Sequence, residues 1–189
     1  PYITEVLQDA ERYQTVFSHD QKSSAAPTAG LHFTPELLQR IRDVGAAICE
    51  VELVVGLDTF KPISVDNPLD HLIHTESYRV PLSTMTACND AHSSGARVIA
   101  IGTTATRALE SAAKLGQLEG RTNLFITPGF EWKVVDMMMT NFHMPRTTLL
   151  LMIQSFIGTR WRELYEEAVA REYRMLSFGD AMLLARRTD

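Results

Sequence analysis

Cysteine is scarce in this sequence: Cys49 and Cys88 are the only two among 189 residues, and they form no CxxC pair. This scarcity excludes a zinc knuckle, a four-thiolate cluster and the three-cysteine motif of radical enzymes that carry an iron–sulfur cluster. A chain of this length buries roughly 70% of the surface of its unfolded form, so its core needs neither disulfides nor a metal ion. We expect the reducing cytoplasm as its compartment.

Long apolar runs are also missing. No segment approaches the roughly 20 apolar residues of a membrane span. The first residues carry the charges of Glu5, Asp9 and Glu11, so we expect neither a signal peptide nor a membrane partner. The net charge of −5 gives no overall field that attracts polyanions, although local basic patches can still bind nucleic acid.

Several motifs of common enzyme classes are absent. The sequence contains no GxGxxG fingerprint, no GxxxxGK[ST] loop, no GxSxG elbow and no HExxH helix. Dinucleotide dehydrogenases, P-loop ATPases, α/β-hydrolases and HExxH peptidases therefore lose most of their support. What remains is a composition of 45% apolar and 22% charged residues, which is typical of a globular domain.

Apolar runs alternate with amphipathic segments along most of the chain. We expect strands over 48–55, 97–101, 124–126 and 134–139. We expect helices over 4–17, 34–45, 83–95, 105–116, 147–156 and 160–173. This alternation predicts a layered α/β fold with a mainly parallel sheet and flanking helices, organised as a single domain over 1–189.

The loop after the run 97–101 is the first candidate site, because ligands of α/β sheets bind at the carboxyl ends of strands. Gly102, Thr103 and Thr104 begin a helix there, where free backbone N–H groups and two hydroxyls can bind a carboxylate, a phosphate or a ribose. The alternative is a helix start without any ligand. Arg107 lies one turn further on, and its alternative is an ion pair with Glu110.

Two more polar segments contain a histidine. In 140–145, His143 can act as a base or a hydrogen-bond donor, and Asn141 can bind an amide, a base edge or a carboxylate. A turn histidine with its own hydrogen bonds is the alternative. In 27–33, small residues permit close backbone approach, and His32 stands just before a helix N-terminus, which lowers the pKa of histidine.

The segment 70–76 contains residues of the types that bind metals. HxxHxE is not a recurring zinc spacing, and on an extended chain His74 and Glu76 share a face that His71 does not. We therefore expect no metal site. Glu76 is a better candidate for a general base or a ligand of ribose hydroxyls, and an ion pair with Arg79 is the alternative.

The chain carries six ordered motifs: RYQTV (12–16), AAPTAGLHFT (25–34), HLIHTE (71–76), RVIAIGTT (97–104), TNFHMP (140–145) and YR followed by GDAM (173–182). Together they resemble the S-adenosylmethionine:tRNA ribosyltransferase-isomerase family of queuosine biosynthesis. The resemblance implies the α/β main domain of that family without its inserted β-barrel. Residues 1–189 would then form the carboxy-terminal part of a longer two-domain protein.

The resemblance also implies an activity. The ribosyl group of S-adenosylmethionine, a co-substrate, is transferred and isomerised onto 7-aminomethyl-7-deazaguanine in tRNA, which gives epoxyqueuosine and releases adenine and methionine. The implied catalytic candidates are His32, Glu76 and His143. The implied substrate-binding residues are Thr28, Gly30, Thr59, Gly102, Thr103, Thr104, Arg107 and Asn141.

One stretch departs from the family pattern LHVGxGTF. Residues 53–60 read LVVGLDTF, so Val54 replaces a histidine and Asp58 a glycine. The carboxylate of Asp58 either favours a sulfonium cation or blocks a close backbone approach. Two other function classes stay open for this reason: a diverged S-adenosylmethionine-binding transferase that acts on a small molecule, and a binding module without turnover.

Overall fold

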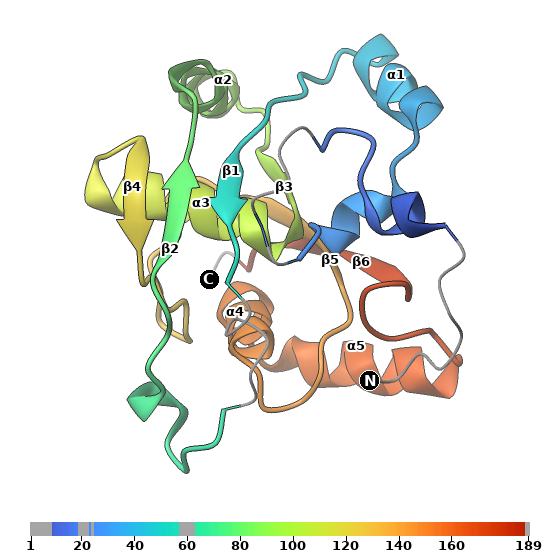
Figure 1. Cartoon of the computed structure of the whole chain (residues 1–189), viewed down its shortest axis with the longest axis vertical. Helices are drawn as coiled ribbons and strands as arrows, with labels where there is room; N and C mark the ends of the chain where they lie inside the picture. Colours follow the sequence, from blue (N-terminus) through green and yellow to red (C-terminus); the bar gives the residue numbers. More distant parts are fainter. Residues whose placement is uncertain (1–8, 19–22, 24, 57–62, 188–189) are drawn as a thin grey trace.

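The computed structural model describes residues 9–18, 23, 25–56 and 63–187 (Figure 1). Its α-helices are α1 (Pro35–Asp43), α2 (Leu82–Ser93), α3 (Gly102–Leu115), α4 (Thr148–Ile157) and α5 (Trp161–Ala170). Its strands are β1 (Glu52–Val54), β2 (Glu76–Arg79), β3 (Ile99–Ile101), β4 (Glu119–Thr122), β5 (Met137–Asn141) and β6 (Ala181–Ala185). Short 3-10 helices are η1 (Ala10–Tyr13), η2 (Thr28–His32), η4 (Pro68–Asp70) and η5 (Gly158–Arg160).

The strands form two three-stranded sheets. One has the order β1-β2-β4 and is antiparallel; in the other, β3-β5-β6, β3 pairs with β5 in parallel and β5 with β6 antiparallel. The predicted α/β class with flanking helices is confirmed. The sheets are less parallel than predicted: among the described strands β3 and β5 are the one parallel pair, and the crossover connection that such a pair needs contains α3.

Helix α3 connects the two sheets, since it contacts β1 and β2 on one side and β3 and β5 on the other (Figure 1). Ala108, Leu109 and Ala112 are buried in a common core with residues of both sheets. The helix ends at Gly116, which has a left-handed φ of +66° and closes the last turn. Because α3 contacts strands of both sheets, the helix lies between them.

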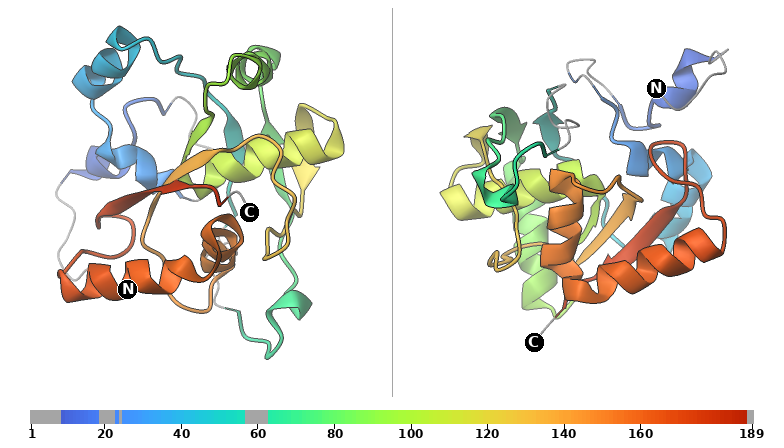
Figure 2. Two further views of the ribbon diagram at one scale, coloured as in Figure 1. Left: turned by 180° about the vertical axis from the view of Figure 1, so that it is seen from behind. Right: turned by 90° about the horizontal axis from the view of Figure 1, so that it is seen from below.

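Helices α1 and α5 lie at opposite sides of the molecule, with the sheet β3-β5-β6 between them (Figures 1 and 2). The predicted start of α1 is confirmed: the Thr34 hydroxyl accepts a hydrogen bond from the Leu37 N–H at 3.2 Å. α1 nevertheless buries no residue completely. Of the helices in the described part of the chain, none is long and apolar enough to cross a membrane.

The strands β2, β4 and β6 were not expected, the strands expected over 48–55 and 134–139 have other bounds, and two expected elements differ more strongly from the structure. Leu124 and Ile126 are buried, at 8% and 2% exposure, but the segment 124–126 is not a strand. The neighbouring β4 ends at Thr122, whose hydroxyl turns back to accept the Leu124 N–H at 3.0 Å. Of the helix expected over 4–17, residues 10–13 form η1, and the earlier part lies outside the described residues.

Candidate active site

The candidate site lies where β3 ends and α3 begins. Gly102 has a φ of +93°, a conformation that L side chains rarely adopt, and this lets α3 start directly after the strand. η2 packs against this point, because a Cβ placed on Gly102 would lie 3.7 Å from the Cβ of Ala29. η2 also contacts β5. Three segments that are far apart in the sequence therefore meet here.

Thr28 and Asn141 join two of these segments directly. The Thr28 hydroxyl donates to the Asn141 Oδ1 at 3.0 Å, and Asn141 is 3% exposed. The Asn141 Nδ2 lies 3.5 Å from both the Asp180 carbonyl oxygen and the His32 Nε2. A carboxamide nitrogen only donates hydrogen bonds, and the Asp180 carbonyl only accepts them. The amide orientation is therefore determined by its neighbours.

This orientation has a consequence for His32. The Asn141 Nδ2 can donate to the His32 Nε2 in the tautomer that places the ring proton on Nδ1. His32 is also exposed to solvent. The backbone N–H of Arg174 is the main cause of the lowered pKa of the nearby Asp180 carboxyl, and His32 in its protonated form adds a smaller lowering. Of the three expected catalytic residues, His32 is the one whose side chain is exposed to solvent and can reach a ligand.

His143 has a different environment. Its Nε2 lies 2.9 Å from the Thr140 hydroxyl, and its backbone N–H donates to the Tyr165 hydroxyl at 2.8 Å. Burial lowers the pKa of His143 from 6.5 to about 4, so the imidazole is neutral near pH 7. Burial also raises the pKa of Tyr165 to about 12. These contacts correspond to the alternative of a turn histidine that is satisfied by its own hydrogen bonds.

Glu76 and Arg107 form a buried ion pair. The Arg107 Nη1 lies 2.5 Å from the Glu76 Oε2, and the Arg107 Nη2 donates to the His74 carbonyl at 3.2 Å. The Glu76 Oε1 accepts the Gly56 N–H at 3.2 Å. Burial lowers the pKa of Arg107, while the charge of Glu76 raises it. Glu76 therefore pairs with Arg107 instead of Arg79, and Arg107 does not pair with Glu110.

A small cavity of about 30 Å³ lies beside this ion pair, with room for about one water molecule. Thr103, Thr104, Glu76 and Arg107 contribute its polar lining. The Arg107 Nε is buried and has no hydrogen-bond partner among the described residues. The first turns of α3 thus face the ion pair on one side and η2 on the other.

Gly30 is needed for packing within the protein. A Cβ at this position would lie 2.6 Å from the Phe17 Cζ and 2.9 Å from the Thr15 Cγ2, distances that real Cβ atoms do not adopt. The side chains of Phe17 and Thr15 therefore occupy the space beside the Gly30 backbone that the small residue leaves open. Thr59 and Asp58 lie outside the described residues.

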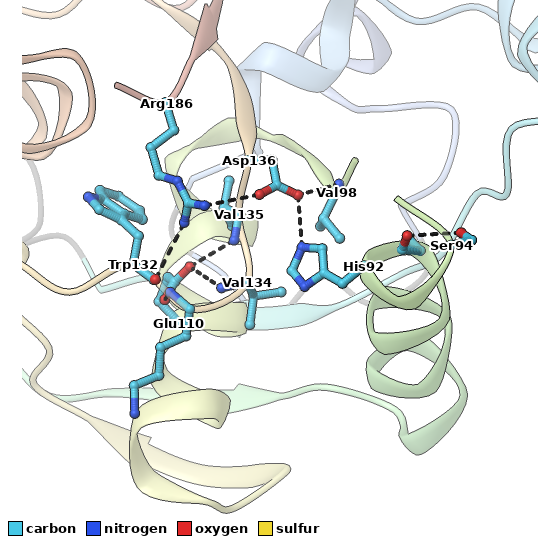
Figure 3. Close-up of polar contacts among 11 residues, drawn as sticks. His92, Ser94, Val98, Glu110, Trp132, Val134, Val135, Asp136 and Arg186 are labelled. Atoms are coloured by element: carbon cyan, nitrogen blue, oxygen red, sulfur yellow. Dashed lines mark hydrogen bonds and ion pairs between the residues drawn. The ribbon is translucent and has the colours of Figure 1, made fainter. Parts of the chain in front are cut away.

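Sequence reasoning missed the roles of Glu110 and Asp136 (Figure 3). The fully buried Glu110 carboxylate accepts the N–H groups of residues 133, 134 and 135 at 2.9–3.0 Å. Asp136 accepts the Val98 N–H at 2.9 Å, and its carboxylate lies 2.8 Å from the His92 Nε2 and 3.2 Å from an Arg186 nitrogen. The sequence did carry one signal for Asp136, because Asp136 is the acidic residue inside the otherwise apolar run 134–139.

Within the described ranges, no group of three or more histidine, cysteine, aspartate or glutamate residues is placed to hold a metal ion.

Fold and site define an α/β protein with polar loops gathered at the start of one central helix. Comparison with known families extends this: residues 1–184 match the model of the family described as queuosine biosynthesis protein. The chain belongs to this family.

Curated relatives match almost the whole chain. The S-adenosylmethionine:tRNA ribosyltransferase-isomerase of Desulfitobacterium hafniense is 49% identical over 97% of this chain and 55% of its own length. The protein of the same name from Thermotoga maritima is 47% identical over 97% of this chain and 56% of its own length. The chain thus spans about half the length of the curated relatives it matches.

A solved structure agrees with the fold. The crystal structure of S-adenosylmethionine tRNA ribosyltransferase from Thermotoga maritima is 43% identical in sequence, with a TM-score of 0.69 over 82% of this chain and 50% of that chain.

Proposed function

We propose that this chain is the catalytic α/β part of an S-adenosylmethionine:tRNA ribosyltransferase-isomerase. The substrates are S-adenosylmethionine and a tRNA that carries 7-aminomethyl-7-deazaguanine, the products are epoxyqueuosine in tRNA, adenine and methionine, and the location is the cytoplasm. Residues 1–189 are the carboxy-terminal part of a longer two-domain protein in this proposal. The names of relatives that are 47–49% identical support it.

The observation that carries the proposal is the meeting of η2, the start of α3 and the end of β5 around Asn141. The contact of Thr28 with Asn141, and that of Ala29 with Gly102, bring these loops to one place. Free N–H groups at the first turn of α3 suit ribose hydroxyls or a carboxylate. Gly102, Thr103 and Thr104 are therefore assigned to the ribosyl part of the substrate.

His32 is assigned as the base. The positive sulfur of S-adenosylmethionine acidifies the neighbouring ribose C5′ hydrogens. The Nε2 of His32, in its unprotonated form, takes one of these protons; the C4′–O4′ bond breaks as the C4′=C5′ double bond forms, and the O4′ electron pair forms the C1′ carbonyl as adenine leaves from C1′. The nucleobase amine then adds to C4′, the resulting C5′ ylide attacks the C1′ carbonyl, and the alkoxide displaces methionine from C5′ as the epoxide closes. Proton transfer by a positioned base contributes about 10²–10⁴-fold in rate.

Glu76 and His143 are assigned supporting positions. The Glu76 carboxylate is held by Arg107 and the Gly56 N–H, so in this proposal it orients ribose hydroxyls rather than accepting a proton. His143 is neutral near pH 7 because of its lowered pKa of about 4. Its role is to hold the turn that follows Asn141.

Adenine release tests this proposal. The natural protein that contains this chain is incubated with S-adenosylmethionine, with and without the modified tRNA, after its intact mass has been determined. We expect tRNA-dependent release of adenine, a loss of at least about 100-fold in His32→Gln, and a loss below about tenfold in His143→Gln. His92→Gln, which changes a histidine at the other end of β3 from Gly102, is the matched control.

Three outcomes contradict parts of the proposal. Adenine release without tRNA points to a transferase with a small-molecule acceptor. Binding of S-adenosylmethionine without any release points to a binding module. Full activity of His32→Gln shows that another group is the base.

A further inference from the structure

The two cysteines of the chain lie next to one contact between distant segments. Cys49 is exposed and stands in the segment that leads from α1 into β1, whereas Cys88 lies in α2 and is 8% exposed. The Thr84 hydroxyl donates to the Glu50 carbonyl at 2.8 Å, and this bond holds the segment against α2 (Figure 1). Thr84 and Cys88 are four positions apart and both buried, so they share one face of α2. Cys88 therefore lies one helical turn from the contact made by the neighbour of Cys49.

The strand pattern directs Cys49 toward the core that contains Cys88. Leu53 is buried in β1, and Val51 packs against the core cluster to which Cys88 belongs. Because side chains of an extended chain alternate, Cys49 falls on the side of Val51 and Leu53. The electrostatics agree with this placement. Burial raises the pKa of the Cys88 thiol, and the charges of Cys49 and Asp136 raise it further, so both of these groups lie near the thiol.

The backbone beside Cys49 has room to adjust. Both cysteines are free thiols in the structure. A disulfide needs Cα atoms about 4.4–6.8 Å apart. Residues 46–51 belong to no helix or strand, so this segment can move toward α2 without breaking the hydrogen bonds of a sheet.

We propose that Cys49 and Cys88 form a reversible disulfide when the protein meets a hydroperoxide. The Cys49 sulfur, as a thiolate, attacks the peroxide, the O–O bond breaks, and Cys49 becomes a sulfenic acid while water or an alcohol leaves. The Cys88 sulfur then attacks the Cys49 sulfur, and the S–S bond forms as the S–OH group leaves as water. Two thiols lose two electrons and two protons, which the peroxide takes up.

The exposure of the two thiols sets this order. Peroxide reaches Cys49 from solvent, whereas Cys88 is buried and its raised pKa disfavours the thiolate that reacts with peroxide. Cys88 is therefore the resolving thiol. Disulfides of cytoplasmic proteins are mostly transient and redox-sensing, which suits a pair with one exposed member. The proposal does not depend on the proposed function.

Peptide mapping of the natural protein that contains this chain tests the proposal. The reduced, folded protein is treated with hydrogen peroxide, free thiols are blocked with iodoacetamide, and trypsin is added without reductant. The two cysteines fall in different tryptic peptides, 43–79 and 80–97, because trypsin does not cut between Lys61 and Pro62. We expect a linked species with the mass of both peptides less two hydrogen atoms, and its disappearance with dithiothreitol. The thermal midpoint of the oxidised protein should rise by about 4 °C or more, since the bond constrains the unfolded chain.

Variants separate the two steps. Cys88→Ala removes the resolving thiol, so Cys49 should stop at the sulfenic acid, which dimedone labels. Cys49→Ser should slow the oxidation of Cys88 by at least about tenfold. Thr84→Val removes the contact with Glu50 and should slow formation of the disulfide about fivefold, the ratio expected for one lost hydrogen bond.

The matched control is Thr86→Val, which changes an exposed threonine of the same helix and should leave the rate within about twofold of the unchanged protein. Thermal melting of each reduced variant verifies that it folds. Four results overturn the proposal: oxidation of Cys49 beyond the sulfenic acid while Cys88 stays a free thiol, a disulfide that joins two molecules instead of residues 49 and 88 of one, a lower thermal midpoint after oxidation, or equal rates for the two threonine variants.

Discussion

The guanidinium of Arg107 and the carboxylate of Glu76 lie 2.5 Å apart, and the two residues are 4% and 3% exposed. Arg107 comes from the second turn of α3, and Glu76 is the first residue of β2. Through the Gly56 N–H and the His74 carbonyl, the same pair also holds the residues that follow β1 and precede β2. One ion pair thus joins the antiparallel sheet to the helix that begins at the candidate site.

Removal of one partner of this pair should destabilise the protein strongly. Arg107→Met leaves a buried carboxylate without its cation, and we expect the free energy of unfolding to fall by about 3–5 kcal/mol in urea denaturation. Arg79→Met, an exposed arginine on the same strand as Glu76, is the control and should change it by less than about 1 kcal/mol. The double variant Arg107→Met with Glu76→Leu should recover most of the lost free energy of unfolding. If the double variant is as unstable as Arg107→Met alone, the unpaired Glu76 carboxylate is not the cause of the loss.

Acid should destabilise the protein through His143. Its pKa is about 4 in the folded chain against 6.5 for an exposed histidine, so below pH 6.5 the unfolded state binds a proton that the folded state does not. Stability is therefore full above pH 6.5 and is lost as the pH falls toward 4, by on the order of 3 kcal/mol.

The measurement for His143 compares urea denaturation of the unchanged protein and of His143→Gln at pH 7.5, 6 and 5. Carboxylates and other histidines contribute equally to both proteins, so the difference between the two curves isolates this imidazole. We expect that difference to shrink as the pH falls. A difference that stays constant with pH contradicts the buried, neutral histidine.

Gly30→Ala should disturb η2 by steric contact alone. The new Cβ meets the Phe17 ring and the Thr15 methyl group at 2.6 and 2.9 Å, and such overpacking costs typically about 1–3 kcal/mol. We expect a lower thermal midpoint and a partial recovery in the double variant with Phe17→Leu. Gly56→Ala, where a Cβ meets no atom within 4 Å, is the control.

Activity of these Gly30 variants separates packing from substrate contact. Recovery of both the thermal midpoint and adenine release in the double variant means that Gly30 makes room for Phe17 only. Recovery of stability without activity means that the substrate itself needs the space at Gly30.

Glu110→Gln should loosen the segment that leads into β5. The carboxylate accepts three backbone N–H groups from residues 133–135, and a glutamine has one oxygen and turns an N–H₂ group toward the remaining donors. We expect a loss of about 2–4 kcal/mol in the free energy of unfolding. Amide hydrogen exchange should become faster at 133–135. Glu119→Gln, exposed on β4, should leave both measurements unchanged.

Local sequence patterns predicted much of the helical structure. Thr34 and Pro35 at the start of α1, and Gly116 after α3, act through contacts within a few residues, so their roles were visible in the sequence. Strand ends were less predictable. The run 124–126 is apolar because it is buried, yet its backbone does not pair as a strand, and burial alone does not distinguish these two cases.

The sequence by itself determined the α/β class, the helix starts and the loops that carry Thr28, His32, Gly102 and Asn141, because these depend on periodicity, capping and motif order. Pairings between distant residues were decided by the tertiary fold. Glu76 pairs with Arg107, 31 positions away, and Glu110 binds the backbone of 133–135 instead of Arg107. The reason is physical: a buried charge binds whichever partner the packing of α3 brings within hydrogen-bond distance, and separation along the chain does not limit that choice.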